Sequence, residues 1–156
     1  MQEVAPAHFR AVMGHFATGV TVVTARGEDG PVGMTANAVC SLSLEPLLLL
    51  VCFDNGARTL RVVREQERFG VNVLASGQAD LARLFASKAP EAEKFADVQH
   101  TVHEGIPVIE GTLAWVGCTL ERLMPGGDHT IGIGAVIAAE FAGEADPLLW
   151  YRGAYR

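Results

Sequence analysis

The sequence predicts a β-rich domain, an antiparallel β-barrel with a few short helices, over residues 1–156. Six or more apolar or β-branched stretches are separated by short turns, a spacing typical of antiparallel strands rather than of βαβ units. The length suits one domain, and 49% hydrophobic against 19% charged residues indicates a packed core. No repeat, linker or low-complexity tract divides the sequence.

In the first half, four apolar residues at i, i+3, i+4 and i+7 predict an amphipathic opening helix: Phe9, Val12, Met13 and Phe16. Richness in β-branched and apolar residues then predicts three strands, at 20–25, near 32–35, and at 47–53. Helical spacing over 58–67 predicts a second helix, and the apolar alternation at 69–74 predicts a further strand.

In the second half, Leu81, Leu84 and Phe85 share one face of a predicted helix over 78–87. Over 90–110 the pattern loosens, and we expect a long surface loop with one helical turn at most. Two long strands follow, at 113–123 and 130–141, with hairpin residues at 125–128 between them.

Charge and cysteine content narrow the class of protein. The net charge of −6 argues against nucleic-acid binding, and no apolar run is long enough to span a bilayer. The segment 1–4 lacks the basic and apolar regions of a signal peptide. The three cysteines are widely spaced in apolar surroundings, which predicts reduced core thiols and a cytoplasmic protein.

Two segments carry polar groups beside predicted strands. The small hydroxyl- and amide-bearing side chains of 33–43 could approach a planar polar ring, or they could only cap a turn. The segment 54–59 ends a strand and opens a helix, where free N–H groups with Arg58 and Thr59 suit a phosphate. Ordinary N-capping by Asp54 or Asn55 is the alternative.

Further candidates carry a weaker signal. Phe85 to Lys88 pairs an aromatic ring with a hydroxyl and a cation at a helix end, where a lysine can simply offset the helix dipole. His129 stands at a hairpin tip, a place where histidines often have no role. We predict no metal site, because the segment 100–103 lacks acidic or cysteine partners, and no dinucleotide fingerprint, because Gly132 and Gly134 lie within a strand pattern.

In order along the chain, seven landmarks resemble the flavin reductase family of the FMN-binding split barrel, a Greek-key-like antiparallel fold. The resemblance covers 9–155 and is carried by these segments: 9–24 (FRAVMGHFATGVTVVT), 33–37 (GMTAN), 41–46 (SLSLEP), 69–74 (FGVNVL), 85–86 (FA), 127–131 (GDHTI) and 147–155 (PLLWYRGAY).

The resemblance implies roles for the matched positions. Hydride passes directly between two bound rings, so no side chain is expected to act as a catalytic residue. The implied flavin-binding residues are Met34, Thr35, Ala36, Asn37, Ser41, Ser43, Cys52, Phe53, Asp54, Asn55, Arg58, Thr59, Phe85, Ala86, Ser87 and Lys88. Those implied to meet the nicotinamide nucleotide are His129, Tyr151 and Arg152.

The resemblance therefore implies an NAD(P)H:flavin oxidoreductase. Its cofactors would be FMN or FAD with NADH or NADPH, and its reduced flavin would supply a partner flavin-dependent monooxygenase. The family also implies a homodimer with sites near the subunit boundary. Two alternatives stay open: an oxidase that keeps its FMN, and a flavin carrier without turnover.

Overall fold

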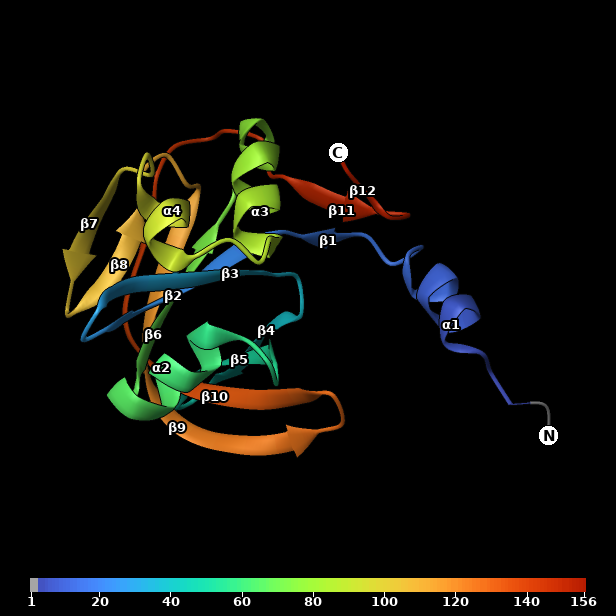
Figure 1. Ribbon diagram of the computed structural model, residues 1–156, viewed down its shortest axis with the longest axis horizontal. Helices are drawn as coiled ribbons and strands as arrows, with labels where there is room; N and C mark the ends of the chain where they lie inside the picture. The colour runs from blue at the N-terminus through green and yellow to red at the C-terminus, as the bar shows by residue number, and fades with distance from the viewer. Residues whose placement is uncertain (1–2) are drawn as a thin grey trace.

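A seven-stranded antiparallel sheet, in the order β3-β2-β6-β9-β10-β5-β4, forms the barrel of this computed structural model (Figure 1). The structure describes residues 3–156. Met1 and Gln2, which belong to the segment 1–4 without signal-peptide features, lie outside this range. The barrel strands are β2 (Thr21–Gly27), β3 (Gly30–Ala36), β4 (Val39–Leu44), β5 (Leu47–Asp54), β6 (Arg68–Val73), β9 (Ala114–Gly126) and β10 (His129–Phe141). The predicted antiparallel barrel is confirmed.

Strands β9 and β10 form the long hairpin that runs through the sheet, closed by the turn at Gly127 and Asp128. Gly132 and Gly134 of β10 leave room for aromatic rings, because a Cβ on either would stand 2.6 Å from the ring of Phe53 or Phe69 respectively. These two rings meet edge to face, with centroids 5.8 Å apart. The glycines are thus packing residues of the core, as the strand interpretation predicted.

Three helices cover the barrel. Helix α2 (Arg58–Gln66) contacts β2, β3 and β5, while α3 (Ala79–Ala86) and α4 (Glu91–Phe95) both lie against β3. One core cluster fills the barrel around Phe53 and Phe69, and a second lies under α3 and α4 around Phe85 and Phe95. A one-turn helix, η1 (Ser76–Gln78), precedes α3.

The surface loop expected over 90–110 is wrong for most of its length, although the helical turn expected within it is present. This stretch holds α4 and a hairpin of β7 (His100–His103) and β8 (Ile106–Ile109). Asn72 ties the hairpin to the barrel, since its Oδ1 accepts from Ile109 N at 2.9 Å. Its Nδ2 donates to Val22 O at 3.0 Å. The hairpin is stabilised by this tertiary contact from a distant strand, and the local periodicity of residues 90–110 carries no sign of that contact.

The histidines of β7 serve as packing residues. His100 lies edge-on to Phe95 at 5.2 Å between ring centroids, and His103 packs against Trp115 at 5.0 Å. Among residues 3–156 no group of three or more His, Cys, Asp or Glu is placed to hold a metal ion. In the same range, no helix is both long and apolar enough to cross a membrane.

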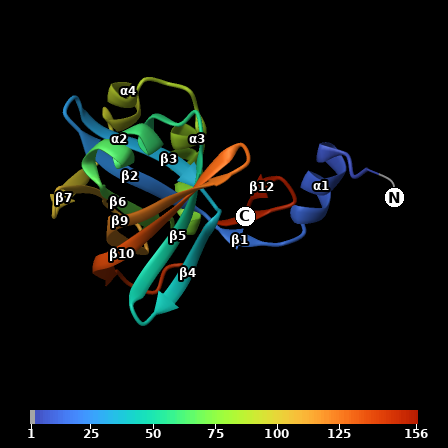
Figure 2. The same ribbon diagram turned by 90° about the horizontal axis from the view of Figure 1, so that it is seen from below.

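An arm projects from the barrel in both ribbon views (Figures 1 and 2). It consists of helix α1 (Pro6–Met13) and a small sheet of β1 (Thr18–Gly19), β11 (Leu149–Tyr151) and β12 (Ala154–Tyr155). Helix α1 has no buried residue, and the rings of Phe9 and Phe16 are 59% and 69% exposed. The helix ends at Met13, so Phe16 of the predicted apolar face lies beyond it, and this apolar surface does not pack into the core of its own chain.

The prediction of three core thiols is wrong for two of them. Cys118 is buried, whereas Cys52 is half-buried and Cys40 is exposed on edge strand β4. Burial raises the pKa of the Cys118 thiol to about 12, because the charged thiolate loses its solvation. Desolvation also raises the pKa of Cys52. Apolar sequence neighbours therefore did not indicate which side of a strand each thiol occupies.

Candidate functional site

The turn between β5 and α2 is fastened to the tip of the β9–β10 hairpin by Asn55. Its backbone N donates to Asp128 O at 3.1 Å and its Nδ2 donates to Gly127 O at 3.0 Å. Its Oδ1 accepts from the hydroxyl of Thr130 at 2.7 Å. Because β5 and β10 pair with Asp54 opposite His129, the hairpin histidine is fixed beside this turn.

Helix α2 begins without a side-chain cap. Its N-cap is Ala57, and no side chain accepts from the first-turn N–H groups. Asp54 accepts instead from Gly56 N at 2.7 Å within the turn, so the N-capping alternative for Asp54 and Asn55 is wrong. Free N–H groups at a helix start favour an anion, which agrees with the phosphate interpretation.

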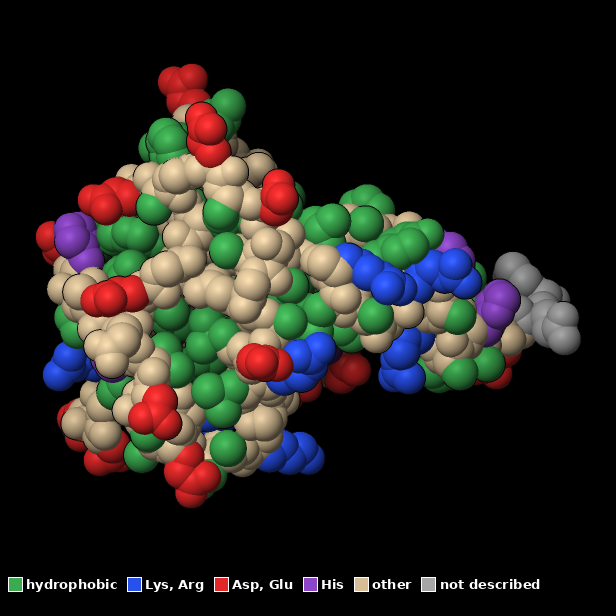
Figure 3. Space-filling view, turned by 90° about the horizontal axis from the view of Figure 1, so that it is seen from above, with side chains coloured by type: hydrophobic (Ala, Val, Ile, Leu, Met, Phe, Trp, Pro, Cys, Tyr) green, Lys and Arg blue, Asp and Glu red, His purple; other side chains and the backbone are tan. Residues whose placement is uncertain are grey.

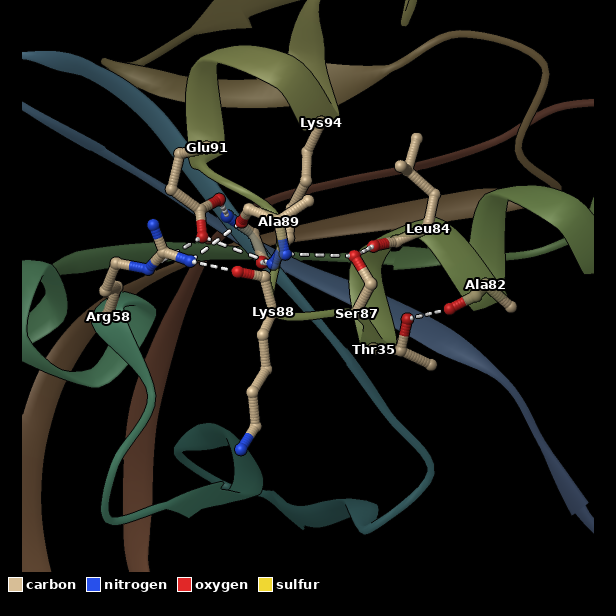
Figure 4. Close-up of polar contacts among 10 residues, drawn as sticks. Thr35, Arg58, Ala82, Leu84, Ser87, Lys88, Ala89, Glu91 and Lys94 are labelled. Carbon is tan, nitrogen blue, oxygen red and sulfur yellow. Dashed lines mark hydrogen bonds and ion pairs between the residues drawn. The ribbon is translucent and has the colours of Figure 1, made fainter.

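Arg58, the first residue of α2, reaches the loop between α3 and α4 (Figure 4). Its Nη2 donates to Ala89 O at 2.7 Å and to Lys88 O at 3.3 Å. The side chain of Lys88 extends away from this polar cluster in the close-up. Arg58 therefore fixes the backbone at Lys88 and Ala89, while the Lys88 ammonium lies apart from the Arg58 guanidinium.

Helix α3, which leads into this loop, is tied to β3. Thr35 donates through its hydroxyl to Ala82 O at 2.6 Å, which joins β3 to α3. Ser87 donates to Leu84 O at 2.7 Å, and Ala89 N donates to the Ser87 hydroxyl at 3.3 Å. Three segments that are distant in the sequence, near residues 35, 55–58 and 87–89, thus form one connected rim.

A cavity of about 820 Å³ lies where the arm meets the barrel. Its lining is largely apolar and includes Asn37 and Cys52, together with arm residues such as Phe16 and Trp150. Asn37 Nδ2 donates to the hydroxyl of Thr18, another lining residue, at 3.2 Å. A concave apolar space with a few polar groups is the usual form of a small-molecule site, and this volume suits a fused aromatic ring system.

Some predicted flavin-binding side chains are not free to touch a ligand. Phe53, Thr59 and Phe85 are almost fully buried, so they could take part only through their backbone or by packing. Phe85 lies so close to Gly33 that a Cβ there would stand 2.7 Å from its ring. Ala36 is also buried, and Thr35 is half-buried at the rim. The remaining predicted side chains are exposed or half-buried: Met34, Asn37, Ser41, Ser43, Cys52, Asp54, Asn55, Arg58, Ala86, Ser87 and Lys88.

The sequence model described as "Flavin reductase like domain" matches residues 13–156. The chain belongs to this flavin reductase family. It is 41% identical over 156 residues to the reductase subunit HsaB of a flavin-dependent monooxygenase from Mycobacterium tuberculosis, covering 98% of this chain and 82% of that protein. It is 39% identical to the reductase component of a 4-nitrophenol monooxygenase from Rhodococcus opacus, covering 99% and 82% respectively.

Solved structures of other flavin reductases share this fold. The NADH:FAD oxidoreductase SgcE6 of Streptomyces globisporus superposes with a TM-score of 0.91 at 39% identity, covering 100% of this chain and 96% of that one. A second structure of SgcE6, in complex with NAD and FAD fragments, gives the same TM-score at 38% identity and the same coverage. The predicted family and split-barrel fold are confirmed.

The three residues predicted to meet the nicotinamide do not form one group within this flavin reductase chain. His129 is at the hairpin tip, while Tyr151 and Arg152 are on the arm, well apart from it in Figure 1. His129 Nδ1 lies 2.7 Å from Asp128 Oδ1, and this contact lowers the pKa of the exposed Asp128 carboxyl. On the arm, Arg152 N donates to Gly14 O at 2.7 Å.

Residues on both sides of the rim were not predicted from the sequence. Glu91 and Lys94 join Arg58 in the polar cluster, although they fell in the stretch expected to be a loop. Opposite charges three residues apart after Pro90 were the available sign of a short helix. Thr18 and Trp150 line the cavity, and only the pairing of β1 with β11 brings them together.

Proposed function

We propose that this chain catalyses the reduction of FMN or FAD by NADH and releases the reduced flavin to a separate flavin-dependent monooxygenase. Two observations carry the proposal: the contacts that join the segments near residues 35, 55–58 and 87–89, and a largely apolar cavity lined by Asn37, just after β3, and by Cys52 of β5. Family membership supports the same activity, and relatives of similar length are named as reductase components of monooxygenases.

The residues present fit a flavin. The uncapped start of α2 offers N–H groups to the phosphate, and Lys88 carries a further cation on the loop that Arg58 contacts. Within the described part of the chain, the contacts of Arg58 use Nε and Nη2, which leaves the Nη1 hydrogens for a phosphate oxygen. The apolar cavity wall, with Asn37 and Thr18, suits the ring and its polar edge.

The bound flavin supplies the redox chemistry, because its ring accepts a hydride from a reduced nicotinamide. The protein needs to orient the two rings at roughly 3–3.5 Å and exclude water. We assign His129 to the nicotinamide nucleotide as a hydrogen-bonding contact. Its place beside Asp54, at the end of the strand that leads to α2, puts it next to the proposed phosphate site.

The proposal includes a homodimer. Large apolar side chains are exposed on the arm, and hydrophobic atoms lie among basic ones there in the space-filling view (Figure 3). A second copy covering the arm would bury Phe9 and Phe16 and close the open side of the cavity that Phe16 lines. It would also allow Tyr151 and Arg152 of one subunit to approach a site on the other. Free thiols at Cys40, Cys52 and Cys118 agree with a cytoplasmic enzyme.

Aerobic NADH oxidation by the purified protein tests the activity, with FMN, FAD or no flavin added. Turnover that depends on added flavin would support a reductase with a diffusible flavin, and the faster flavin would be the preferred substrate. NADPH in place of NADH compares the two donors. Turnover without added flavin would instead indicate an oxidase that keeps its FMN. Flavin binding without NADH oxidation would indicate a carrier and refute the proposed activity.

A further inference from the structure

The carboxylate of Glu91 contacts three elements next to the rim: β3, the start of α2 and its own helix α4 (Figure 4). Its Oε2 accepts from Gly33 N of β3 at 3.0 Å. Its Oε1 lies 3.3 Å from Lys94 Nζ and 3.5 Å from Arg58 Nε. One side chain therefore connects a barrel strand, the start of α2 and its own helix α4.

The cluster is shielded from solvent on one side only. The side chains of Glu91 and Lys94 are 12% and 5% exposed, whereas that of Arg58 is 42% exposed. Lys94 Nζ also lies within 3.5 Å of Gly33 O. The buried lysine balances the charge of Glu91, so the carboxylate stays fixed where it can hold the more exposed guanidinium.

Arg58, held in place by Glu91, in turn fixes the backbone of the loop at residues 87–89. With Nε facing Glu91, its Nη2 meets the carbonyl oxygens of Lys88 and Ala89, at 3.3 and 2.7 Å. A planar guanidinium held on one edge presents its other nitrogens in a fixed direction. The orientation of Arg58 thus sets both the backbone of the loop and the direction of its unused Nη1.

We propose that Glu91 is a positioning residue for flavin: it fixes Arg58, and through it the 87–89 loop, in the arrangement that binds the flavin. This inference rests on the proposed function, because the loop and Arg58 matter only if flavin binds at the rim. Without Glu91 the loop is freer and the flavin leaves faster. NADH binding, which we assign to the region of His129, is unchanged.

The test must separate positioning from simple loss of stability. Glu91→Gln alone leaves Lys94 charged and buried, so it is compared with the double variant Glu91→Gln/Lys94→Met, which removes both charges, and with Lys94→Met. A second route is Arg58→Met, which keeps the buried pair and removes both the link to the loop and the guanidinium proposed for the phosphate. The matched control is Asp80→Asn, an acid-to-amide change in the exposed Asp80–Arg83 pair on α3, whose atoms are 2.7 Å apart.

The readouts are the dissociation constants of FMN and riboflavin from fluorescence titration without NADH, the KM values for flavin and NADH, and the melting temperature. We expect Glu91→Gln/Lys94→Met to weaken both flavins roughly tenfold, as for loss of one charge-assisted contact, and Asp80→Asn to change neither by more than about twofold. The KM for NADH should stay within about twofold of the parent. Riboflavin has no phosphate, so its weaker binding to Arg58→Met would show that the loop has been displaced.

Unchanged flavin affinity in Glu91→Gln/Lys94→Met and in Arg58→Met would overturn the inference, whatever their melting temperatures. Loss of FMN affinity with unchanged riboflavin affinity in both variants would also overturn it, because the residues would then serve the phosphate alone. Failure of the proposed function has a different signature: the parent protein would bind flavin yet show no flavin-dependent NADH oxidation. The titrations without NADH would still report on Glu91 in that case.

Discussion

At the scale of single residues, close packing decides what several positions can accept. Gly134 is enclosed by Cys118 and Phe69, and a Cβ there would stand 2.6 Å from atoms of both side chains. Contacts that short force neighbouring atoms to move, and the interior of a barrel between two paired strands has little freedom to move.

We expect Gly134→Ala to lower the free energy of unfolding by about 1–3 kcal/mol through overpacking. The measurement is denaturant unfolding of the variant against the parent. Gly77→Ala is the control, since a Cβ at Gly77 meets nothing within 4 Å. Equal stability of the two variants would contradict the packing described for Gly134.

The three thiols should react in the order of their exposure. At pH 8 Cys118 remains protonated, because burial raises its pKa to about 12, and it is also inaccessible. An alkylating reagent should therefore modify Cys40 first, Cys52 more slowly and Cys118 only after unfolding. Mass spectrometry of peptides over time checks this order, and early labelling of Cys118 would contradict its burial.

The role assigned to His129 predicts different effects on the KM for NADH and the KM for flavin. We expect His129→Ala to raise the KM for NADH roughly tenfold, as for loss of one polar contact, and that for flavin by less. Steady-state kinetics with each substrate varied in turn gives both values. A larger change in the KM for flavin would move His129 to the flavin site.

At the scale of helices and strands, the β7–β8 hairpin is held by a buried side-chain network centred on Asn72. Asn72 donates to Val22 O and to the Thr24 hydroxyl and accepts from Ile109 N, so it connects β2, β6 and β8. Thr24 in turn donates to Pro107 O at 2.6 Å. Most polar groups of this junction are satisfied by each other, which makes the network sensitive to one replacement.

Replacing Asn72 with Leu should destabilise the fold by about 2–4 kcal/mol, because three buried polar groups lose their partner. Hydrogen exchange should quicken first at Ile109, whose N–H donates to Asn72. Gln99→Leu, on the exposed stretch before β7, is the control and should stay within about 0.5 kcal/mol of the parent. Slow exchange at Ile109 in the Asn72 variant would contradict the role of this side chain.

The elements that could be predicted from the sequence are those with a local pattern. The β-branched strand that became β2, the leucine run of β5 and the long β9–β10 hairpin all follow from periodicity and turn residues. The β7–β8 hairpin could not be predicted, since its partner, Asn72, lies in another strand. Exposed β4 was also missed, because its serines and small residues match a capped turn as well as an edge strand.

At the scale of the whole molecule, the arm is the part in which an apolar sequence pattern lies exposed to solvent. Its helix has the apolar spacing of a buried face, yet no residue of α1 is buried in this chain. Exposed apolar surface of this kind marks an interface. The predicted site shows the same incompleteness, since His129 and the Tyr151–Arg152 segment lie apart within one chain.

Replacing both arm phenylalanines, Phe9→Ser/Phe16→Ser, should weaken dimerisation by roughly tenfold or more in dissociation constant and weaken flavin binding with it. Sedimentation velocity over a range of concentrations reports the first effect, and flavin titration reports the second. Phe141→Ser removes an even more exposed phenylalanine at the far end of β10 and should leave both values unchanged. A monomeric parent protein would remove the basis of the proposed dimer.

The candidate site was predictable where residues adjacent in sequence stay adjacent in space. The segment 54–59 kept its predicted place at a strand end and a helix start. The links between segments, such as Arg58 to Ala89 and Thr35 to Ala82, depend on how α3 and α4 lie on β3 and left no sign in the sequence. Glu91 is the clearest example, because its partners are distant residues of the chain, apart from Lys94.

The position of the β7–β8 hairpin decides where foreign sequence can be joined to this protein. The hairpin stands at the opposite end of the molecule from the arm in both ribbon views, and its turn at Glu104 and Gly105 is exposed. Residues 3 and 156, the two ends of the described range, both run into the arm region, so an affinity tag joined there competes with whatever covers the arm. A fluorophore or small domain spliced at Gly105 would face solvent, leaving the arm and the flavin rim untouched.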